Sequence, residues 1–348
     1  MAPLFSKVLK VSAAVIATRA LLRRARRIDF SGRTVVISGG SRGLGLEMAR
    51  CFGHEGADLA LLARDDDELR RAQQELESIG VNVLPLRCDI RDEQNIEESV
   101  RRIIEWKRRI DVLVNNAGVI QVGPLENLDR KDFDAAVDTH LCGPFHLINQ
   151  VIPQMKRQGE GRVVNIASIG GKVAVPHLLP YSMSKFALVG LSDGTRSELA
   201  KYGIRVTTVC PGLMRTGSHV NAEFKGHHQA EFALFSFSNA VPLFSVNAAH
   251  AARQIVDACR YGDSFLMISP QARMLHLMNA VFPNLTADIF KGVARIMPRS
   301  IESNDSKTGW ESRSPLAPRW ATKLADRATE RNNEKGRAEG SESSKQFG

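Results

Sequence analysis

Short apolar runs rich in β-forming residues alternate with longer stretches of helical period between Arg33 and Ser269, and this alternation restricts the fold more than any other feature. The seven runs read TVVIS, DLALLA, NVLPL, DVLVNNA, RVVNIA, RVTTVC and SFLMIS. Strands that alternate with helices along a chain form a parallel sheet covered by helices on both faces. The sequence therefore predicts an α/β fold with a doubly wound, Rossmann-like parallel sheet of about seven strands.

Other segments flank this α/β domain, which we place at residues 29–269. Residues 1–28 form a basic N-terminal segment, and residues 270–298 contain two short amphipathic patterns, ARMLHLMNAVF and TADIFKGVARIM, which predict appended C-terminal helices. Residues 299–348 are polar and have no periodicity, so we expect a disordered tail there.

Charge and cysteine content exclude several functions. The net charge is +9, but residues 1–30 alone hold seven Lys or Arg against the single acid Asp29, so the domain itself offers no surface for nucleic acid. The five cysteines are scattered singly, which argues for a reducing, cytoplasmic location and against disulfides or a metal site. The adjacent pair His227 and His228 has no acidic cluster beside it, and we interpret both as loop residues rather than metal ligands.

A glycine-rich turn follows the first predicted strand directly. The segment SGGSRGLG places Gly39, Gly43 and Gly45 where a helix begins. Glycines let a backbone turn sharply and approach a pyrophosphate, whose charge the free N–H groups at a helix N-terminus favour. Because the turn also follows the first strand of an alternating pattern, it predicts a dinucleotide site.

From about Asp29 to Ile268 the chain resembles the short-chain dehydrogenases/reductases. SGGSRGLG corresponds to the family's TGxxxGxG with Ser38 in place of Thr, and YSMSK corresponds to its YxxxK. Between and after them stand CDI, NNAG, IAS and CPGLMRT, in the order that the family has them. The resemblance implies a dehydrogenase/reductase domain with a nicotinamide cofactor, bound by Gly39, Ser41, Arg42, Gly43, Leu44, Gly45, Arg64, Asp89, Asn116, Ala117, Gly118, Tyr181, Lys185, Pro211, Gly212 and Thr216.

Tyr181 and Lys185 stand four positions apart, so on a helix they share one face. A phenol has a pKa of about 10, and a neighbouring ammonium favours the phenolate, which gives the lysine a reason to be there. By resemblance, Tyr181 exchanges a proton with the substrate oxygen while hydride moves between nicotinamide and carbonyl carbon. Ser168 then holds the substrate oxygen, and Lys185 also holds the nicotinamide ribose.

His140 departs from the family pattern, which usually has an Asn at this position to fix a water in the proton relay. A histidine can also hold water and carry a proton, so we count His140 among the candidate catalytic residues. The alternative is a histidine satisfied on a helix face that takes no part in the reaction.

The end of the second predicted strand indicates the cofactor. NAD-using members carry an acid there for the ribose hydroxyls, whereas this chain has Ala63 followed by Arg64. Arg42 adds a second cation, and the two suit the 2′-phosphate of NADP(H). Either arginine alone could instead be a solvated surface residue.

The segment between Gly212 and Val246, where the family places its substrate lid, contains Phe232, Phe235, Phe237 and Phe244. We infer a bulky lipophilic alcohol or carbonyl substrate, unless these rings pack on the core or on a partner chain. We expect a homo-oligomer and no nucleic-acid partner.

Residues 1–28 also suggest weak peripheral membrane contact. Wound as a helix, they place apolar residues on one side, followed by a basic cluster at Arg23–Arg27, although Arg19 and Arg23 interrupt the apolar side. The alternative is packing of this helix on its own domain or on the helices near residues 274–297.

Two rival functions need consideration. GLSDG, residues 190–194, fits the G-x-S-x-G hydrolase motif, but the pattern around Ser192 predicts one continuous helix rather than the required strand-to-helix turn. A nonenzymatic nucleotide-binding or scaffold protein on the same fold is the other rival, and only His140 favours it. The expected function is an NADP(H)-dependent oxidoreductase that interconverts alcohols with ketones or aldehydes.

Overall fold

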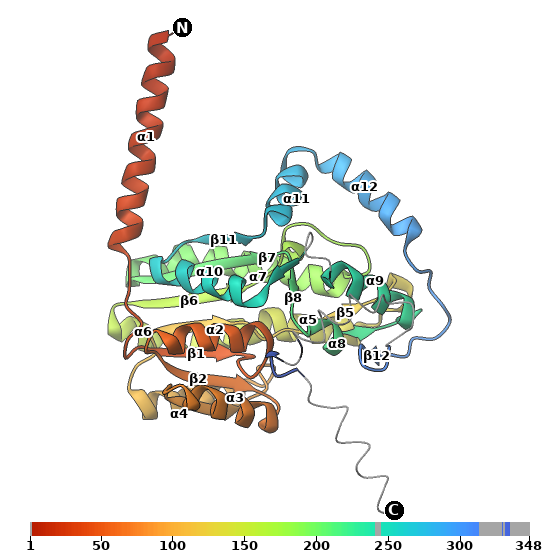
Figure 1. The fold of residues 1–348 in the computed structure, drawn as a ribbon, viewed down its shortest axis with the longest axis horizontal. Coiled ribbons are helices and arrows are strands. Elements are labelled where there is room, and N and C mark those ends of the chain that lie inside the picture. The colour runs from red at the N-terminus through yellow and green to blue at the C-terminus, as the bar shows by residue number, and fades with distance from the viewer. Residues whose placement is uncertain (1, 241–244, 313–328, 330, 335–348) are drawn as a thin grey trace, which may run out of the picture.

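The computed structural model describes residues 2–240, 245–312, 329 and 331–334 (Figure 1). Its central sheet has seven strands in the order β11-β7-β6-β4-β1-β2-β3, all paired in parallel. The strands are β1 (Thr34–Ser38), β2 (Asp58–Ala63), β3 (Val83–Arg87), β4 (Val112–Asn115), β6 (Gly161–Ile166), β7 (Ile204–Pro211) and β11 (Phe265–Ile268). Each strand falls on one of the seven apolar runs, which confirms the predicted α/β sheet.

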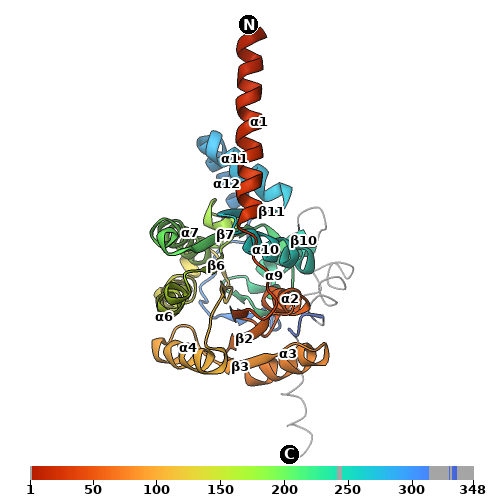
Figure 2. The same ribbon diagram turned by 90° about the vertical axis from the view of Figure 1, so that its left-hand side faces the viewer.

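Helices cover both faces of this sheet (Figure 2). One face carries α4 (Glu93–Lys107), α6 (Gly143–Gln158) and α7 (Leu179–Leu199), and the other carries α2 (Gly43–His54), α3 (Asp66–Ser78) and α10 (Ala248–Tyr261). Three of these helices begin where a side chain accepts from free backbone N–H groups: Asp65 caps α3, Asp92 caps α4 and Asn247 caps α10. The capping residues therefore set where each connection enters its helix.

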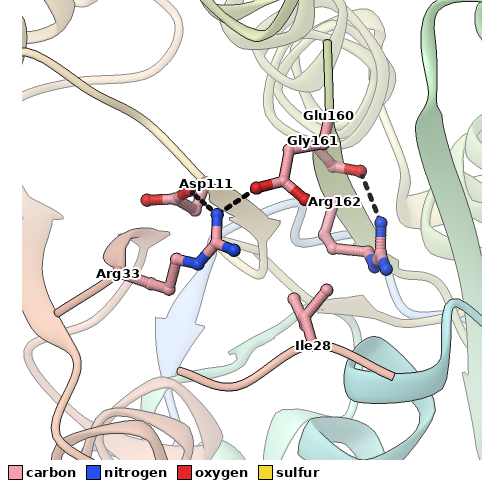
Figure 3. A pocket seen from close by; sticks show the side chains of 6 residues that line it. All are labelled: Ile28, Arg33, Asp111, Glu160, Gly161 and Arg162. Atoms are coloured by element: carbon pink, nitrogen blue, oxygen red, sulfur yellow. Dashed lines mark hydrogen bonds and ion pairs between the residues drawn. The ribbon is translucent and has the colours of Figure 1, made fainter. Parts of the chain in front are cut away.

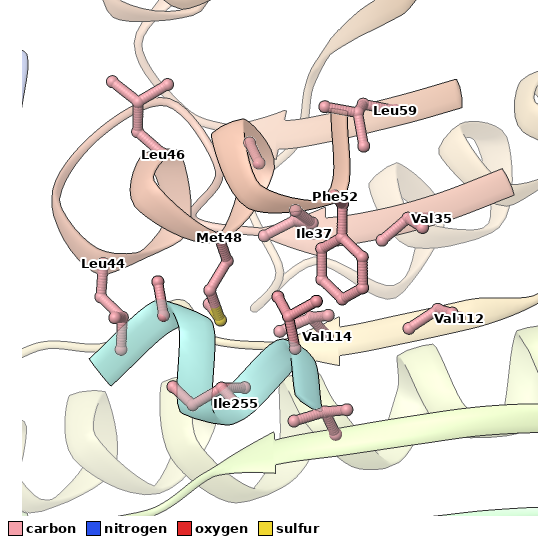
Figure 4. Packing of buried hydrophobic residues seen from close by; sticks show 14 of the residues in the cluster. Val35, Ile37, Leu44, Leu46, Met48, Phe52, Leu59, Val112, Val114 and Ile255 are labelled. Carbon is pink, nitrogen blue, oxygen red and sulfur yellow. The ribbon is translucent and has the colours of Figure 1, made fainter. Parts of the chain in front are cut away.

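The core lies in two layers because each central strand is buried on both faces. Val35 and Ile37 of β1 point to the layer that also holds Phe52 of α2 and Ile255 of α10 (Figure 4). Val36 points to the opposite layer, against α4 and α6. Burying each such side chain stabilises the fold by about 1.5–3 kcal/mol. The two layers therefore hold the strands rigidly, and the residues that follow the strand ends have fixed positions.

Smaller elements gather beyond the carboxyl ends of the strands. They are β5 (Gln121–Val122), α5 (Arg130–Val137), a π-helical turn (Asp138–Cys142), β8 (Leu213–Arg215), α8 (Ser218–Asn221), β9 (Glu223–Phe224), α9 (His228–Ala240), β10 (Ser245–Asn247) and β12 (Lys307–Thr308). Single 3₁₀ turns lie at Leu125–Asn127, Ile169–Gly171 and Ala200–Tyr202. β8 pairs with β10, and β9 pairs with both β5 and β12, so two small sheets cover this end.

Three helices project from another end of the molecule: α1 (Ala2–Ala25), α11 (Pro270–Val281) and α12 (Pro283–Ile296) (Figures 1 and 2). α11 and α12 are the appended C-terminal helices that the sequence predicts. The base of α1 is attached through Arg23, whose Nε lies 2.9 Å from Asp263 Oδ1 and whose guanidinium stacks on the Tyr261 ring. Among the helices described, none is long and apolar enough to cross a membrane.

A small crevice lies at the amino-terminal edge of the sheet (Figure 3). Arg33 forms ion pairs there with Asp111, at 2.7 Å, and with Glu160. The buried Arg162 guanidinium donates to the Arg26 carbonyl oxygen over 2.8 Å, and burial lowers its pKa. Because the backbone and neighbouring carboxylates already satisfy these arginines, we interpret the crevice as a structural joint between the N-terminal segment and the domain.

The sequence predicts a disordered tail from residue 299 onward, and the structure describes residues 299–312, 329 and 331–334 of this segment. β12 pairs antiparallel with β9, and Asn127 donates to the backbone oxygens of Ile301 and Ser303 over 2.7 and 3.0 Å. Residues 331–334 lie against the glycine-rich loop. The partners of this polar segment are distant from it along the chain. Its local sequence therefore needs no periodic pattern of apolar residues.

Candidate active site

The glycine-rich loop lies where the strand order reverses, between β1 and β4, which is where open α/β sheets bind their ligands. Gly39 and Gly43 have φ angles of +65° and +59°, in the left-handed region that favours glycine. A Cβ on Gly45 would overlap the Gly39 carbonyl oxygen. The loop is therefore a cradle that only glycines can form, and its shape suits a pyrophosphate at the start of α2.

Asn116 fastens this loop to the end of β4. Its Nδ2 donates to the carbonyl oxygens of Ser38 and Gly39 over 3.1 and 3.0 Å. The Ser38 hydroxyl in turn accepts from the Asn116 and Ala117 backbone N–H groups over 3.0 and 3.2 Å. These bonds need only a hydroxyl group, so Ser38 can make them in place of the Thr of the family pattern and still join β1 to the end of β4. Behind it, a Cβ on Gly118 would lie 3.1 Å from His140 Nε2.

The two arginines proposed for cofactor choice have different surroundings. Arg64 follows β2 and is exposed. Arg42 Nη1 lies 2.8 Å from Oε1 of Glu68, a buried carboxylate of α3 whose Oε2 accepts from the Ser41 hydroxyl over 3.0 Å. A phosphate at this position would therefore find Arg64 accessible but would have to share Arg42 with Glu68.

The remaining predicted cofactor residues lie at the same edge of the sheet. Asp89 follows β3, where hydrogen bonds from Arg91 lower its pKa. Pro211 ends β7, and the Gly212 N–H donates to the Ile268 carbonyl oxygen over 3.2 Å. The Thr216 hydroxyl lies 2.9 Å from that of Ser218. These positions line the carboxyl ends of parallel strands, together with Leu44 and the loop glycines.

Ser168, Tyr181 and Lys185 come together beyond the end of β6. The Ser168 Oγ accepts from the Gly170 N–H over 3.0 Å, and this hydroxyl lies near enough to the Tyr181 phenol to lower the pKa of the phenol. Lys185 Nζ donates to the Ile166 carbonyl oxygen over 2.8 Å and lies 5.7 Å from the centre of the Tyr181 ring. Two hydroxyls and one amine thus share a small space, as the spacing on α7 predicts.

Burial dominates the protonation of this trio. It raises the pKa of the Tyr181 phenol, although the hydrogen bond from Ser168 opposes the effect. Burial also lowers the pKa of the Lys185 amine from 10.5 to about 7. We expected the ammonium to favour phenolate, but in this state desolvation of the phenol is the larger effect. Near neutrality the site therefore holds a protonated phenol beside an amine that gains and loses its proton readily.

His140 is completely buried in the π-helical turn between α5 and α6. Its Nε2 accepts from the Val119 N–H over 3.2 Å, so the proton must be on Nδ1, which lies 2.7 Å from the Ser184 hydroxyl. The ring stands edge-on to Tyr181 with centroids 5.5 Å apart. Burial, followed by the charge of Lys185, lowers its pKa well below 6.5. Both nitrogens are engaged, which is the geometry of a neutral positioning residue.

The structure argues against the hydrolase alternative. Ser192 is buried inside α7, where it accepts from Asn165 Nδ2 over 3.1 Å and from the Thr208 hydroxyl over 2.8 Å. A nucleophile on a turn needs an exposed hydroxyl. Ser192 instead belongs to a buried polar network.

The aromatic lid differs in part from the expectation. Phe232 is buried and packs edge-on against Phe224 at 5.5 Å, and Phe235 lies 5.9 Å from the same ring. These two rings therefore pack on the small sheets, as the alternative interpretation holds, while Phe237 stays 42% exposed. Phe244 lies outside the described residues.

The paired histidines also have structural surroundings. His228 Nδ1 lies 3.1 Å from the Ser312 hydroxyl, and His227 is exposed. Within the described part of the chain, no group of three or more His, Cys, Asp or Glu side chains could hold a metal ion.

Sequence reasoning missed three sets of residues at the site. Glu68 pairs with Arg42, Ser184 bonds His140, and residues 331–334 contact the loop, where the Gly43 N–H donates to the Asn332 carbonyl oxygen over 2.9 Å. Ser184 lies inside the YSMSK motif, one position before Lys185, which is the only local signal among the three. The others depend on contacts that no short motif records.

Comparison with known proteins agrees with this geometry. The family model described as short chain dehydrogenase matches residues 33–225. Oxidoreductase UcpA of Salmonella typhimurium is 35% identical over 62% of this chain and 82% of its own, and a putative ketoacyl reductase of Streptomyces coelicolor is 40% identical over 52% and 70%. The structure of actinorhodin polyketide ketoreductase with NADPH is 32% identical and covers 69% of this chain and 97% of its own, with a TM-score of 0.63. A levodione reductase structure is 27% identical and covers 70% and 99%, with a TM-score of 0.62.

Proposed function

Because the chain belongs to the short-chain dehydrogenase/reductase family of oxidoreductases, we propose that it interconverts an alcohol and a ketone or aldehyde with NADP(H) as cofactor. The observation that carries the proposal is the gathering of the Ser168 hydroxyl, the Tyr181 ring and the buried Lys185 amine beyond the end of β6. The glycine cradle and the Asn116 fastening support a dinucleotide on the same edge of the sheet.

Each residue of the trio has a separate part in the proposed mechanism. The cofactor, when bound, supplies or accepts the hydride. Tyr181 gives its phenolic proton to the substrate oxygen in the reductive direction and takes it back in the oxidative one. Ser168 holds that oxygen by a hydrogen bond, and Lys185, with a pKa of about 7, contacts the nicotinamide ribose and favours the phenolate as the proton leaves. His140 keeps the Tyr181 ring in place.

The test is the substitution Tyr181→Phe, which removes the proton donor and little else. Turnover of carbonyl substrates, followed by NADPH absorbance, should fall by about 100-fold or more, while the NADPH dissociation constant should change little. Tyr202→Phe is the matched control, because Tyr202 lies on a surface turn and only stacks with Lys156 and Lys201. Unchanged turnover in Tyr181→Phe would refute the mechanism. A wild type that binds NADPH but reduces nothing in a broad panel would favour the scaffold alternative.

The proposed preference for NADP(H) depends chiefly on Arg64, because Arg42 is already paired with Glu68. Relatives with bound NADPH or NADP support it. A charge-assisted hydrogen bond contributes about 1.5–3 kcal/mol, so Arg64→Asp should weaken NADPH binding by about 10- to 100-fold and bring NADH closer to parity. A wild-type preference for NADH would contradict the proposal.

The proposed substrate is lipophilic. Support comes from relatives named as ketoacyl and polyketide ketoreductases and from Phe237 of the lid segment, which stays 42% exposed. A screen of aromatic, acyl and polycyclic carbonyls against small polar hydroxy acids decides the question. Saturable turnover with the polar acids alone would overturn the proposed class.

We further propose that this enzyme is cytoplasmic and makes weak peripheral contact with anionic membranes. Val15, Leu21 and Leu22 of α1 are 61%, 70% and 51% exposed, so these side chains do not pack on the domain or on the appended helices. A second apolar surface lies on α11 and α12, at the end of the molecule from which α1 also projects (Figures 1 and 2). Its exposed side chains are Met274, Leu277, Val281, Phe282, Leu285, Ile289, Val293 and Ile296.

Basic residues of α1 complement an anionic bilayer, since each adds about 1 kcal/mol near its surface. The test is flotation with anionic liposomes at low and high salt. We expect binding to weaken with salt, to fall when the chain starts at Asp29, and to fall in the double variant Leu277→Glu with Leu285→Glu. Equal flotation of all three proteins would remove both surfaces as membrane contacts.

The proposed homo-oligomer has support from a different surface. Phe145 of α6 and Met183 and Phe186 of α7 are 45%, 40% and 43% exposed on helices that cover the same face of the sheet. Light scattering should show a Phe186→Glu variant with a lower mass than wild type. A monomeric wild type would refute self-association.

A further inference from the structure

Residues 331–334 occupy the mouth of the glycine-rich loop. The Asn332 carbonyl oxygen accepts from the Gly43 N–H over 2.9 Å, and Asn333 Nδ2 donates to the carbonyl oxygens of Ser41 and Glu68 over 2.8 and 3.0 Å. Asn333 has a φ angle of +58°, a left-handed conformation that Asn tolerates better than most residues. The segment is therefore held by specific bonds to the loop backbone rather than by loose surface contact.

Glu334 closes the contact on the other side of the loop. Its carboxyl group accepts from the Gly217 N–H, between β8 and α8, and the residue is only 4% exposed. A Cβ on Gly43 would lie 3.0 Å from Glu334 Oε1. The carboxyl group thus lies between the start of α2 and the turn after β8, next to Gly43 and Thr216, which the family resemblance assigns to the dinucleotide.

The same groups cannot serve the segment and a pyrophosphate together. The first N–H groups of a helix have no partner within the helix, and they are what an anion binds there. In this structure the Gly43 N–H is bonded to the Asn332 oxygen, and the oxygens of Glu334 fill the space in front of it.

We propose that residues 331–334 are an internal ligand of the cofactor site, which covers its pyrophosphate-binding part in the cofactor-free protein and must leave before the dinucleotide binds. The inference rests on the proposed function, since it requires a dinucleotide at this loop. The Glu334 carboxyl group occupies part of the space that a phosphate would fill, and the backbone carbonyl of Asn332 accepts from the N–H that the phosphate would use. The apparent cofactor affinity is then the intrinsic affinity multiplied by the fraction of molecules in which the segment is undocked.

The protonation of Glu334 gives the docked segment a pH dependence. Burial raises its pKa to about 8, while Arg42 and the Gly217 N–H oppose the shift and Glu68 adds to it. His219, two residues after Gly217, has its Nδ1 3.3 Å from the Thr216 carbonyl oxygen. Because docking raises the pKa of this carboxyl, docking takes up a proton between its ordinary pKa and 8. The segment should therefore release more easily as the pH rises toward 8, and the dinucleotide should bind more tightly there.

The test compares NADPH binding by the full-length wild type and the double variant Asn333→Ala with Glu334→Ala. The variant loses four side-chain hydrogen bonds of the segment, with Arg71, Ser41, Glu68 and Gly217, and also its left-handed Asn. Its NADPH dissociation constant should therefore fall by about 10-fold. Glu302→Ala, an exposed acid of the same tail, is the control and should bind like wild type. Glu334→Gln should remove the pH dependence of the affinity between about pH 6 and 8.

Hydrogen exchange supplies a readout independent of affinity. In wild type, NADPH should speed exchange in residues 331–334, and in the double variant the Gly43 amide should exchange faster without cofactor. Unchanged or weaker NADPH binding by the double variant, or increased protection of residues 331–334 by NADPH, would overturn the competition and indicate a clasp over bound cofactor. Failure of wild type and variant to bind either NADPH or NADH would instead refute the proposed function, and the competition with it.

Discussion

The buried amine of Lys185 should lower the free energy of unfolding of the protein. Its amine is 4% exposed, and burial lowers its pKa from 10.5 to about 7, with no carboxylate among the causes of the shift. In an unfolded chain the same amine keeps its ordinary pKa, so the unfolded state binds more protons between pH 7 and 10.5. The free energy of unfolding contributed by this residue therefore rises with pH across that window.

The size of the effect follows from the shift. At 1.36 kcal/mol per pKa unit, the difference destabilises the folded chain by about 5 kcal/mol near pH 6 and by about 2 kcal/mol near pH 9. Replacing Lys185 with Met removes this cost and also the bond to the Ile166 carbonyl oxygen, about 1 kcal/mol. We expect Lys185→Met to be more stable than wild type by about 3–4 kcal/mol near pH 6 and about 1 kcal/mol near pH 9.

Urea denaturation of the cofactor-free protein at several pH values measures the difference. Lys225→Met is the matched control, because Lys225 is buried but lies 2.7 Å from Asp132, a pairing that raises its pKa overall although burial opposes it. Its loss leaves a buried carboxylate unpaired and should destabilise the chain by about 3–5 kcal/mol. A Lys185→Met variant that is no more stable than wild type at pH 6, or an advantage that does not shrink with rising pH, would refute the reasoning.

Three other substitutions test the site and its rivals. His140→Asn should leave the pH profile of kcat unchanged between about pH 6 and 8, because the pKa of His140 lies well below that range; a shifted profile would identify a titrating relay instead. Gly45→Ala should abolish NADPH binding in calorimetry while the chain stays folded by circular dichroism, since the new Cβ overlaps the Gly39 oxygen, and retained affinity would contradict the cradle. Ser192→Ala removes two buried hydrogen bonds and should lower the free energy of unfolding by about 1–3 kcal/mol, with no effect on ester hydrolysis. An esterase activity that is present in wild type and lost in this variant would support the hydrolase alternative.

The seven-stranded sheet could be predicted from short segments of the chain, and the same is true of the closeness of Tyr181 to Lys185. The inner strands β1, β4, β6 and β7 are buried on both faces, so their apolar runs are continuous and visible without any partner. Tyr181 and Lys185 share a helix face at fixed spacing, and the loop glycines stand directly after a strand. These features depend on short segments, and short segments are what local sequence patterns describe.

Tertiary structure decided how those residues are used. The sequence left two interpretations of His140, and the structure shows that Val119 and Ser184 hydrogen-bond both nitrogens of its ring. The lowered pKa of Lys185 results from burial that its neighbours along the chain do not provide. The contact of Asn333 with Ser41 joins residues 292 positions apart. A polar stretch without periodicity gives no sign of such a partner, because its order comes from groups at the far end of the chain.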